Sequence, residues 1–254
     1  MTIQVFANEA ALASAAAQQV ARALEARPAL VLGLPTGRTP VALYRELATL
    51  AASGRVDFSG VTTFNLDEFV GLPPGDPRGY RAFMDAHLFH PAGIPATRVH
   101  FLDGTAADID GECRRYEAAI AGAGGIDLLL LGVGVNGHIG FNEPAPGLRA
   151  RTHLAVLHPG TRAANAGAFG GDPAAVPARA LSMGMATILA ARAIVVLATG
   201  AEKAGAVRRA VDGPLTTEVP ASFLQLHPAV TWMLDEAAAH ELGPACRREA
   251  GQVS

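Results

Sequence analysis

The sequence predicts an α/β fold built on an open, mostly parallel β-sheet. Two patterns along its 254 residues lead to this prediction. Short apolar runs of strand length alternate with longer segments of helical periodicity, which is the order in which βαβ units are built. One of these runs, from Ile126 to Gly132, is apolar almost throughout, as is typical of a parallel strand buried on both faces. Helices are therefore expected on both faces of a Rossmann-like sheet.

The N-terminal half alternates strands and helices that are marked by local signals. Asn8 follows the first strand and can cap an alanine-rich helix that runs to about residue 26. Pro40 suits the first turn of the second helix, with Thr39 as its N-cap, and this helix is expected to end near residue 52. The strands expected here are Thr2–Phe6, Ala29–Gly33, Val61–Asn65 and Val99–Leu102, and further helices are expected over residues 80–89 and 109–121.

The C-terminal half contains a glycine-rich loop and an excursion from the sheet. The loop Gly132–Gly140 directly follows the buried strand, and residues 144–180 are rich in Gly, Ala and Pro, which favours a loop-and-helix segment that acts as a mobile lid. Two further strands, Ala193–Thr199 and Val230–Leu234, flank the helix Ala201–Val211. No repeat or linker interrupts this order, so residues 1–254 are expected to form a single α/β domain.

Composition and charge exclude several classes of function. A net charge of −3 and an isoelectric point near 6.2 provide no basic surface, so no nucleic-acid partner is expected. No apolar run approaches the roughly 20 residues that span a bilayer, and the N-terminus resembles a strand rather than a signal peptide. The chain is therefore expected in the cytoplasm and not at a membrane. Cys113 and Cys246 have no metal-binding or redox spacing, and both are expected to be reduced, structural residues.

Polar clusters follow the predicted strands, and the carboxyl ends of parallel strands are where open α/β sheets bind ligands. The first cluster is the turn before the second helix, where free backbone N–H groups and side-chain donors can bind an anion. It has neither the GK[ST] of a Walker A loop nor the GxGxxG of a dinucleotide-binding turn, so an ordinary tight turn is the alternative. Its candidate phosphate ligands are Thr36, Gly37, Arg38 and Thr39, with Leu34 and Pro35 as further substrate contacts.

Charged side chains follow two other strands. Asp67 and Glu68 come after Val61–Asn65, and a desolvated carboxylate there can act as a general base because burial raises its pKa toward neutrality. Glu68 is a further candidate substrate contact. Capping of the next segment is the alternative role for Asp67. Lys203 follows the strand Ala193–Thr199 and is the only lysine among the 20 basic residues, which makes it a candidate ligand for an anion.

The glycine-rich loop carries the remaining candidates. Gly134 and Gly137 leave room for a ligand beside His138, and Asn136 lies two residues before the histidine. Glu143 can orient the imidazole or tune its pKa. A surface or core histidine is the alternative, and no second His or Cys has a metal-ligand spacing, so no metal site is expected. Acids, bases and anion donors without a nucleophile motif indicate proton transfer on a phosphorylated small molecule.

Five segments together resemble the glucosamine-6-phosphate deaminases. They are residues 32–40, 63–73 (TFNLDEFVGLP), 131–145 (LGVGVNGHIGFNEPA), 180–186 and 224–228 (LQLHP). The similarity runs from the first strand to about Ala237, and the related 6-phosphogluconolactonases share the fold but lack the GFNEP run. The resemblance implies conversion of glucosamine 6-phosphate and water to fructose 6-phosphate and ammonia, without a metal or an organic cofactor.

The resemblance also implies a role for each candidate residue. Asp67 matches the base that moves a proton between C2 and C1 of the open-chain sugar. His138 matches the group that opens the sugar ring, assisted by Asn136 and Glu143. The turn at residues 34–39 and Lys203 match the phosphate-binding elements, so the expected partner is a sugar phosphate. A homo-oligomer is compatible with the sequence.

Two residues depart from the family's pattern. Gly167 stands in the excursion where members commonly have an arginine that reaches the substrate phosphate, and Arg38 stands where relatives usually have a small residue. These departures leave open a related sugar-phosphate isomerase or lactonase, or a catalytically silent sugar-phosphate sensor. Relatives that are allosterically activated use polar and basic residues just after the GFNEP run, where this chain has Pro146, His153 and Ala155.

Overall fold

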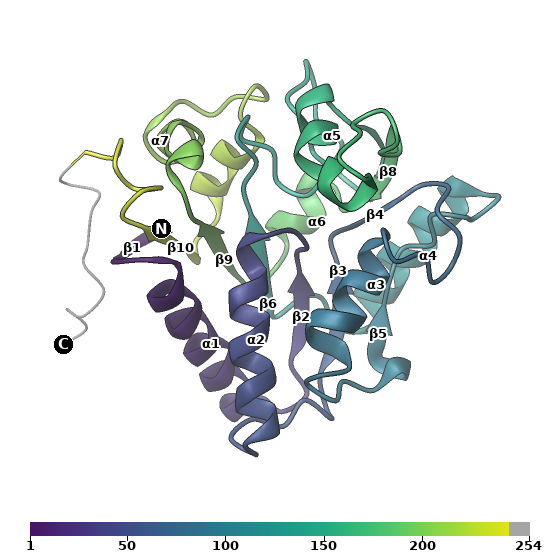
Figure 1. Cartoon of the computed structure of the whole chain (residues 1–254), viewed down its shortest axis with the longest axis vertical. Coiled ribbons are helices and arrows are strands. Elements are labelled where there is room, and N and C mark those ends of the chain that lie inside the picture. The colour runs from purple at the N-terminus through teal and green to yellow at the C-terminus, as the bar shows by residue number, and fades with distance from the viewer. Residues whose placement is uncertain (244–254) are drawn as a thin grey trace.

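The computed structural model describes residues 1–243, and its main feature is a seven-stranded sheet (Figure 1). Every neighbouring pair of strands in this sheet is parallel, in the order β1-β10-β9-β6-β2-β3-β5. The predicted open, parallel sheet is therefore confirmed. Its strands are β1 (Thr2–Phe6), β2 (Val31–Leu34), β3 (Thr62–Asn65), β5 (Val99–His100), β6 (Leu128–Gly132), β9 (Ala193–Ala198) and β10 (Val230–Asp235).

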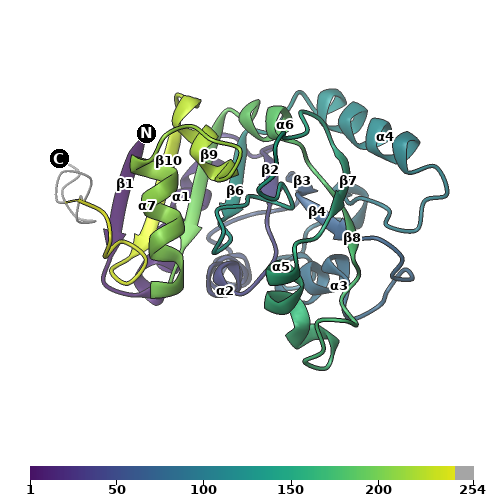
Figure 2. The same ribbon diagram turned by 90° about the horizontal axis from the view of Figure 1, so that it is seen from above.

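Helices cover both faces of this sheet, as the sequence predicts (Figure 2). One face packs against α1 (Glu9–Ala26), α2 (Thr39–Ala52), α3 (Tyr80–Met84) and the π-helical turn Asp85–Phe89 that continues α3. The other face packs against α4 (Ile109–Gly122), α6 (Met185–Leu189), α7 (Ala204–Asp212) and the 3₁₀ segment Pro220–Leu226. A short 3₁₀ turn, Ala201–Lys203, precedes α7.

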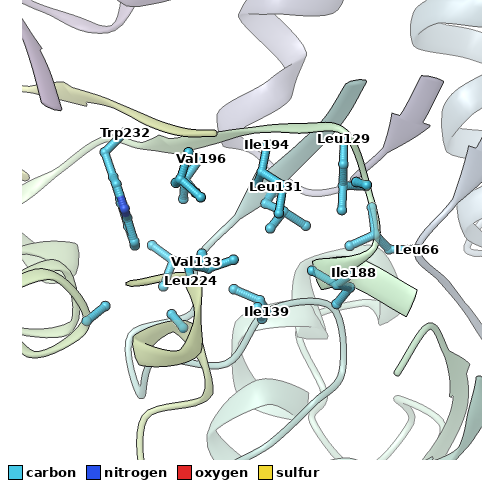
Figure 3. Close-up of a cluster of buried hydrophobic side chains, with 14 of the residues drawn as sticks. Leu66, Leu129, Leu131, Val133, Ile139, Ile188, Ile194, Val196, Leu224 and Trp232 are labelled. Atoms are coloured by element: carbon cyan, nitrogen blue, oxygen red, sulfur yellow. The ribbon is translucent and has the colours of Figure 1, made fainter. Parts of the chain in front are cut away.

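The central strands are apolar along their whole length because alternate side chains enter two different cores. On β6 and β9, Leu129, Leu131, Ile194 and Val196 point to one face, where they meet residues from α6 and the glycine-rich loop (Figure 3). The intervening side chains, Leu128, Leu130, Val195 and Leu197, belong to the core under α1 and α2. A strand with both faces buried needs no polar alternation.

A second, three-stranded antiparallel sheet corrects two predictions. It has the order β4-β8-β7 and consists of β4 (Asp67–Phe69), β8 (Arg179–Ser182) and β7 (His153–Val156). Asp67 therefore opens a new strand instead of closing the third strand of the parallel sheet. Residues 144–180 are not only loop and helix, since they contain β7 and the start of β8. The strands are short and pair with segments distant in sequence, so local patterns gave no signal for them.

The lid segment between β7 and β8 has its own small core. It contains α5 (Pro159–Asn165) and a 3₁₀ turn (Ala166–Phe169). Phe169 is buried, packs edge-on against Phe69 with ring centroids 5.6 Å apart, and carries the Arg78 guanidinium 5.4 Å from its ring centroid. In Figure 1, α5 lies above the upper end of β2. The lid segment is thus packed onto β4 and the loop that follows it.

Of the two N-caps predicted for α1 and α2, the first is confirmed and the second is wrong. The Asn8 side chain accepts a hydrogen bond from the Ala11 N–H at 2.9 Å, as predicted for the N-cap of α1. Thr39 is not the N-cap of α2, because the helix already begins at Thr39 and Arg38 holds the cap position without a side-chain hydrogen bond. The Thr39 hydroxyl instead lies 3.4 Å from that of Thr199. Cys113 is a buried, free thiol, and Cys246 lies outside the described residues.

The strand order places the candidate residues at one point of the sheet. From β2 the chain continues to β3 and β5 on one side, whereas β9 and β10 lie beyond β6 on the other side. Loops that follow β2 and β6 therefore diverge, and such a switch point is where open α/β sheets bind ligands.

Candidate active site

The turn after β2 offers donors for an anion. Gly37 has a φ of +104°, a conformation that favours glycine, and the first turn of α2 leaves backbone N–H groups without helical partners. The Tyr44 hydroxyl donates to the Pro35 carbonyl at 2.5 Å and fixes the start of the turn. Leu34 is fully buried in the core, so its side chain supports the turn and does not face a ligand. Arg38 projects outward with 95% of its side chain exposed.

Lys203 lies next to this turn although it is far away in sequence. The Arg38 guanidinium is 3.9 Å from the carboxylate of Glu202, the neighbour of Lys203. Burial lowers the pKa of Lys203; the Glu202 charge raises it and the Arg38 charge lowers it further. Gly200, with a φ of +92°, turns the chain after β9 and donates its N–H to the Asp235 carboxylate. Two cations and the start of α2 thus flank one region, as an anion site requires.

Asp67 is a buried carboxyl at the junction of the two sheets. Only 7% of the residue is exposed, and burial, followed by repulsion from Glu68, raises its pKa to about 8. Its charge in turn raises the pKa of the buried Tyr44 and Tyr80 hydroxyls, which burial raises most. A carboxyl with a pKa near neutrality matches the requirement for a general base.

The Glu68 carboxylate binds three backbone N–H groups. Its carboxylate accepts hydrogen bonds from the N–H groups of Phe69 at 2.8 Å, Tyr80 at 3.0 Å and Arg81 at 2.8 Å. These bonds occupy both carboxylate oxygens and tie the start of α3 to β4. The structure therefore gives Glu68 a supporting role beside Asp67, where the sequence suggested a substrate contact.

The glycines of the loop after β6 make room for the histidine ring. A methyl group at Gly134 would lie 2.3 Å from Cε1 of His138, closer than any real contact. Gly137 has a φ of +92°, and its N–H bonds to the Gly134 carbonyl at 2.9 Å to close the turn. The two glycines are thus required by the turn and by the position of His138.

His138, Glu143 and Asn136 form one hydrogen-bonded group, as the sequence suggested. Nδ1 of His138 lies 3.3 Å from Oε2 of Glu143, and the Asn136 amide donates to the same oxygen at 2.8 Å. Burial raises the pKa of Glu143, but its bonds with His138, Thr161 and Asn136 outweigh this and lower it to about 2. An ionised Glu143 favours the tautomer with the proton on Nδ1, which leaves Nε2 as the nitrogen that can accept a proton.

The lid segment adds two residues that the sequence analysis did not single out. The Thr161 hydroxyl lies 3.5 Å from Nδ1 of His138, and the Tyr80 hydroxyl donates to the Asn165 side chain at 2.9 Å. Neither has a motif of its own, and only their contacts across the fold identify them. Gly167 is exposed, and a Cβ added there would have no heavy atom within 4 Å, so the lid segment places no cation at this position. Among residues 1–243, no group of three or more His, Cys, Asp or Glu side chains could hold a metal ion.

Comparisons with known proteins identify the family of this chain. A profile described as glucosamine-6-phosphate isomerases/6-phosphogluconolactonase matches residues 6–141 and 147–232. The glucosamine-6-phosphate deaminase of Halothermothrix orenii is 47% identical over 239 residues, 94% of this chain and 99% of that protein. That of Rhodopirellula baltica is 49% identical over 237 residues, 93% of this chain and 94% of that protein.

A solved structure has the same fold over nearly the full length. It is a monomeric glucosamine-6-phosphate deaminase that is 40% identical, with a TM-score of 0.91 over 94% of this chain and 99% of that one. Fold, site geometry and sequence similarity thus point to one group of proteins. The chain belongs to the family of glucosamine-6-phosphate isomerases and 6-phosphogluconolactonases.

Proposed function

We propose that this chain is a glucosamine-6-phosphate deaminase, which converts glucosamine 6-phosphate and water to fructose 6-phosphate and ammonia. The observation that carries the proposal is the pairing of a buried Asp67, whose pKa is raised to about 8, with a separate His138–Glu143 group. The reaction needs two kinds of proton transfer, one to open the ring and one between carbons. Relatives of that name are 47% and 49% identical to this chain.

The substrate phosphate binds between the turn after β2 and Lys203. Backbone N–H groups at the start of α2 and the hydroxyls of Thr36 and Thr39 donate to the phosphate oxygens. Lys203 and Arg38 supply positive charge. A phosphate held here leaves the sugar to extend toward Asp67 and the loop after β6.

Ring opening begins at His138. Its Nε2 takes the proton from the anomeric hydroxyl as the ring C1–O5 bond breaks, and the imidazolium then gives that proton to O5. Glu143, anionic throughout, stabilises the imidazolium that forms, and Asn136 holds the Glu143 carboxylate. The product of this step is the open-chain aldehyde.

Isomerisation and loss of ammonia follow. Asp67 removes the C2 proton while the C1 carbonyl oxygen takes up a proton from solvent, and the Asp67 carboxylic acid then returns its proton to C1 of the resulting enolamine. This leaves an iminium at C2, to which water adds. Ammonia then departs and fructose 6-phosphate remains.

An assay for ammonia separates the competing functions. Purified protein is incubated with glucosamine 6-phosphate and with galactosamine 6-phosphate, and ammonia and ketose phosphate are measured. A lactonase would release acid from a phosphosugar lactone and no ammonia, an isomerase would form ketose phosphate without ammonia, and a silent sensor would bind without turnover. Release of both products in equal amounts is the result expected, and their absence with both sugars would refute the proposal.

Arg38→Ala is expected to raise KM roughly 10- to 100-fold, with a smaller effect on kcat. The phosphate carries close to two negative charges, Gly167 provides no cation, and a guanidinium can bind two phosphate oxygens at once. Arg45, an exposed arginine on α2, provides the matched control as Arg45→Ala. A KM within about twofold of the wild-type value for Arg38→Ala would assign Arg38 to the solvent-exposed surface.

N-acetylglucosamine 6-phosphate is expected not to activate the enzyme. The side chains of Pro146 and Ala155 offer no donors, and Nδ1 of His153 donates to the Arg151 carbonyl at 3.1 Å. Burial lowers the pKa of His153, so it is neutral at pH 7 and gives no charge for a phosphate. Initial rates against substrate concentration, with and without this sugar, provide the measurement; a change from sigmoidal to hyperbolic kinetics would contradict the expectation.

No helix within residues 1–243 is long and apolar enough to cross a membrane. The cytoplasmic location and the homo-oligomer that the sequence allows stay predictions. Cell fractionation tests the location, and light scattering of the purified chain tests the oligomeric state.

A further inference from the structure

We infer that Thr161, carried by the lid helix α5, is a positioning residue for ring opening: its hydroxyl completes the hydrogen bonding of Glu143 and holds His138, and Tyr80 keeps α5 in place through Asn165. This inference rests on the proposed function. It names two residues, Thr161 and Tyr80, that the chemistry described above does not use. Both are identified by contacts between segments that are distant in sequence.

Thr161 lies between the lid and the His138–Glu143 group. It is 4% exposed, its Oγ1 is 3.5 Å from Nδ1 of His138, and it hydrogen-bonds the Glu143 carboxylate. The backbone N–H of His158, just before α5, donates to the other oxygen of Glu143 at 3.3 Å. The lid therefore supplies two of the donors that surround this carboxylate, and Asn136 supplies another. If Thr161 moves away, Glu143 loses a hydrogen-bond donor and Nδ1 of His138 loses the neighbouring hydroxyl.

Tyr80 fixes the helix that carries Thr161. Its hydroxyl donates to Oδ1 of Asn165 at 2.9 Å, and the Asn165 amide donates to the Thr161 carbonyl at 2.9 Å. The Tyr80 ring is half-buried and packs against Phe69, with centroids 4.6 Å apart. In Figure 1, α5 lies above α3. The Tyr80 side chain thus holds α5 against the start of α3.

The same hydroxyl also reaches the proposed phosphate turn. Tyr80 has a side-chain hydrogen bond with Thr36, which belongs to the turn after β2. A continuous set of contacts therefore connects Thr36, Tyr80, Asn165 and Thr161 to His138. This set joins the part of the site that holds the phosphate to the part that opens the ring.

The test separates ring opening from the later steps. Thr161→Val keeps the β-branched shape but removes the hydroxyl, and Thr161→Ser keeps the hydroxyl. The substrates are glucosamine 6-phosphate and 4,5-dideoxyglucosamine 6-phosphate, which lacks the 4- and 5-hydroxyls and can close neither a furanose nor a pyranose ring. For Thr161→Val we expect kcat to fall about 10-fold with the cyclic substrate, the factor for one lost hydrogen bond to a charged group, and less than about twofold with the analogue.

Two further variants make the outcome decisive. Thr161→Ser is expected to stay within about twofold of wild type on both substrates. Tyr80→Phe, which keeps the ring packing on Phe69, is expected to reproduce the selective loss on the cyclic substrate. Equal losses on the two substrates for Thr161→Val and Tyr80→Phe, or no rescue by serine, would overturn the inference, because general damage to the lid affects every step. Failure of the proposed function would look different, since wild type itself would then release no ammonia.

Discussion

Asp67→Asn is expected to lower kcat for glucosamine 6-phosphate by about 10²–10⁴-fold, the usual contribution of a general base, while substrate binding stays near the wild-type value. The amide has the shape of the carboxylate but cannot accept the C2 proton. Steady-state kinetics and calorimetric titration with substrate measure the two quantities separately. A variant that kept more than about a tenth of the wild-type kcat would show that Asp67 is not the base.

The ionisation of Asp67 gives this prediction a pH signature. Burial, with a smaller contribution from Glu68, raises its pKa to about 8, and only the ionised form can act as a base. The kcat/KM of the wild type should therefore rise with pH and level off above about 8, and this rise should be absent in the residual activity of Asp67→Asn.

The raised pKa of Asp67 also predicts how the stability of Asp67→Asn, relative to wild type, changes with pH. An aspartate whose pKa is raised on folding contributes stability that is fully present below its unfolded pKa and is lost as pH rises through about 8. The asparagine variant has no such loss. Its melting temperature, relative to that of wild type, should therefore increase between pH 5 and pH 9, and a decrease would contradict the burial argument.

His138→Gln is expected to lower kcat about 10²-fold with the cyclic substrate and much less with the open-chain analogue 4,5-dideoxyglucosamine 6-phosphate. Glutamine can still hydrogen-bond Glu143, which lies 3.3 Å from the histidine ring, but it cannot accept a proton from the anomeric hydroxyl. The analogue bypasses ring opening and needs only the later steps. Initial rates of ammonia release on both substrates provide the measurement.

A second histidine serves as the control for this variant. His240 is an exposed histidine near the end of the described residues, far in sequence from the loop after β6, and His240→Gln should leave both rates within about twofold of wild type. Equal losses on the two substrates for His138→Gln would remove the assignment of His138 to ring opening and leave it a general role in the site.

The sequence alone determined the parallel sheet and the backbone turns of the glycine-rich loop after β6. Apolar runs such as Ile126–Gly132 predicted buried parallel strands because burial on both faces needs no polar alternation. The glycine at 134 and the glycine at 137 marked a loop with a demanding backbone, and the structure explains both through the His138 ring and a positive φ. Such signals are local, since each depends on a residue and its immediate neighbours.

Only the tertiary structure decided how the candidate groups act. The second sheet, in which Asp67 pairs with Ser182, joins segments more than a hundred residues apart, and no local pattern encodes that pairing. The raised pKa of Asp67 follows from burial at this junction, and Glu68 next to it is committed to backbone N–H groups. Thr161 reaches His138 only because the lid packs back onto the loop after β6. Burial and distance between remote segments are properties of the folded chain, and they set both the pKa of a group and the partners it can bind.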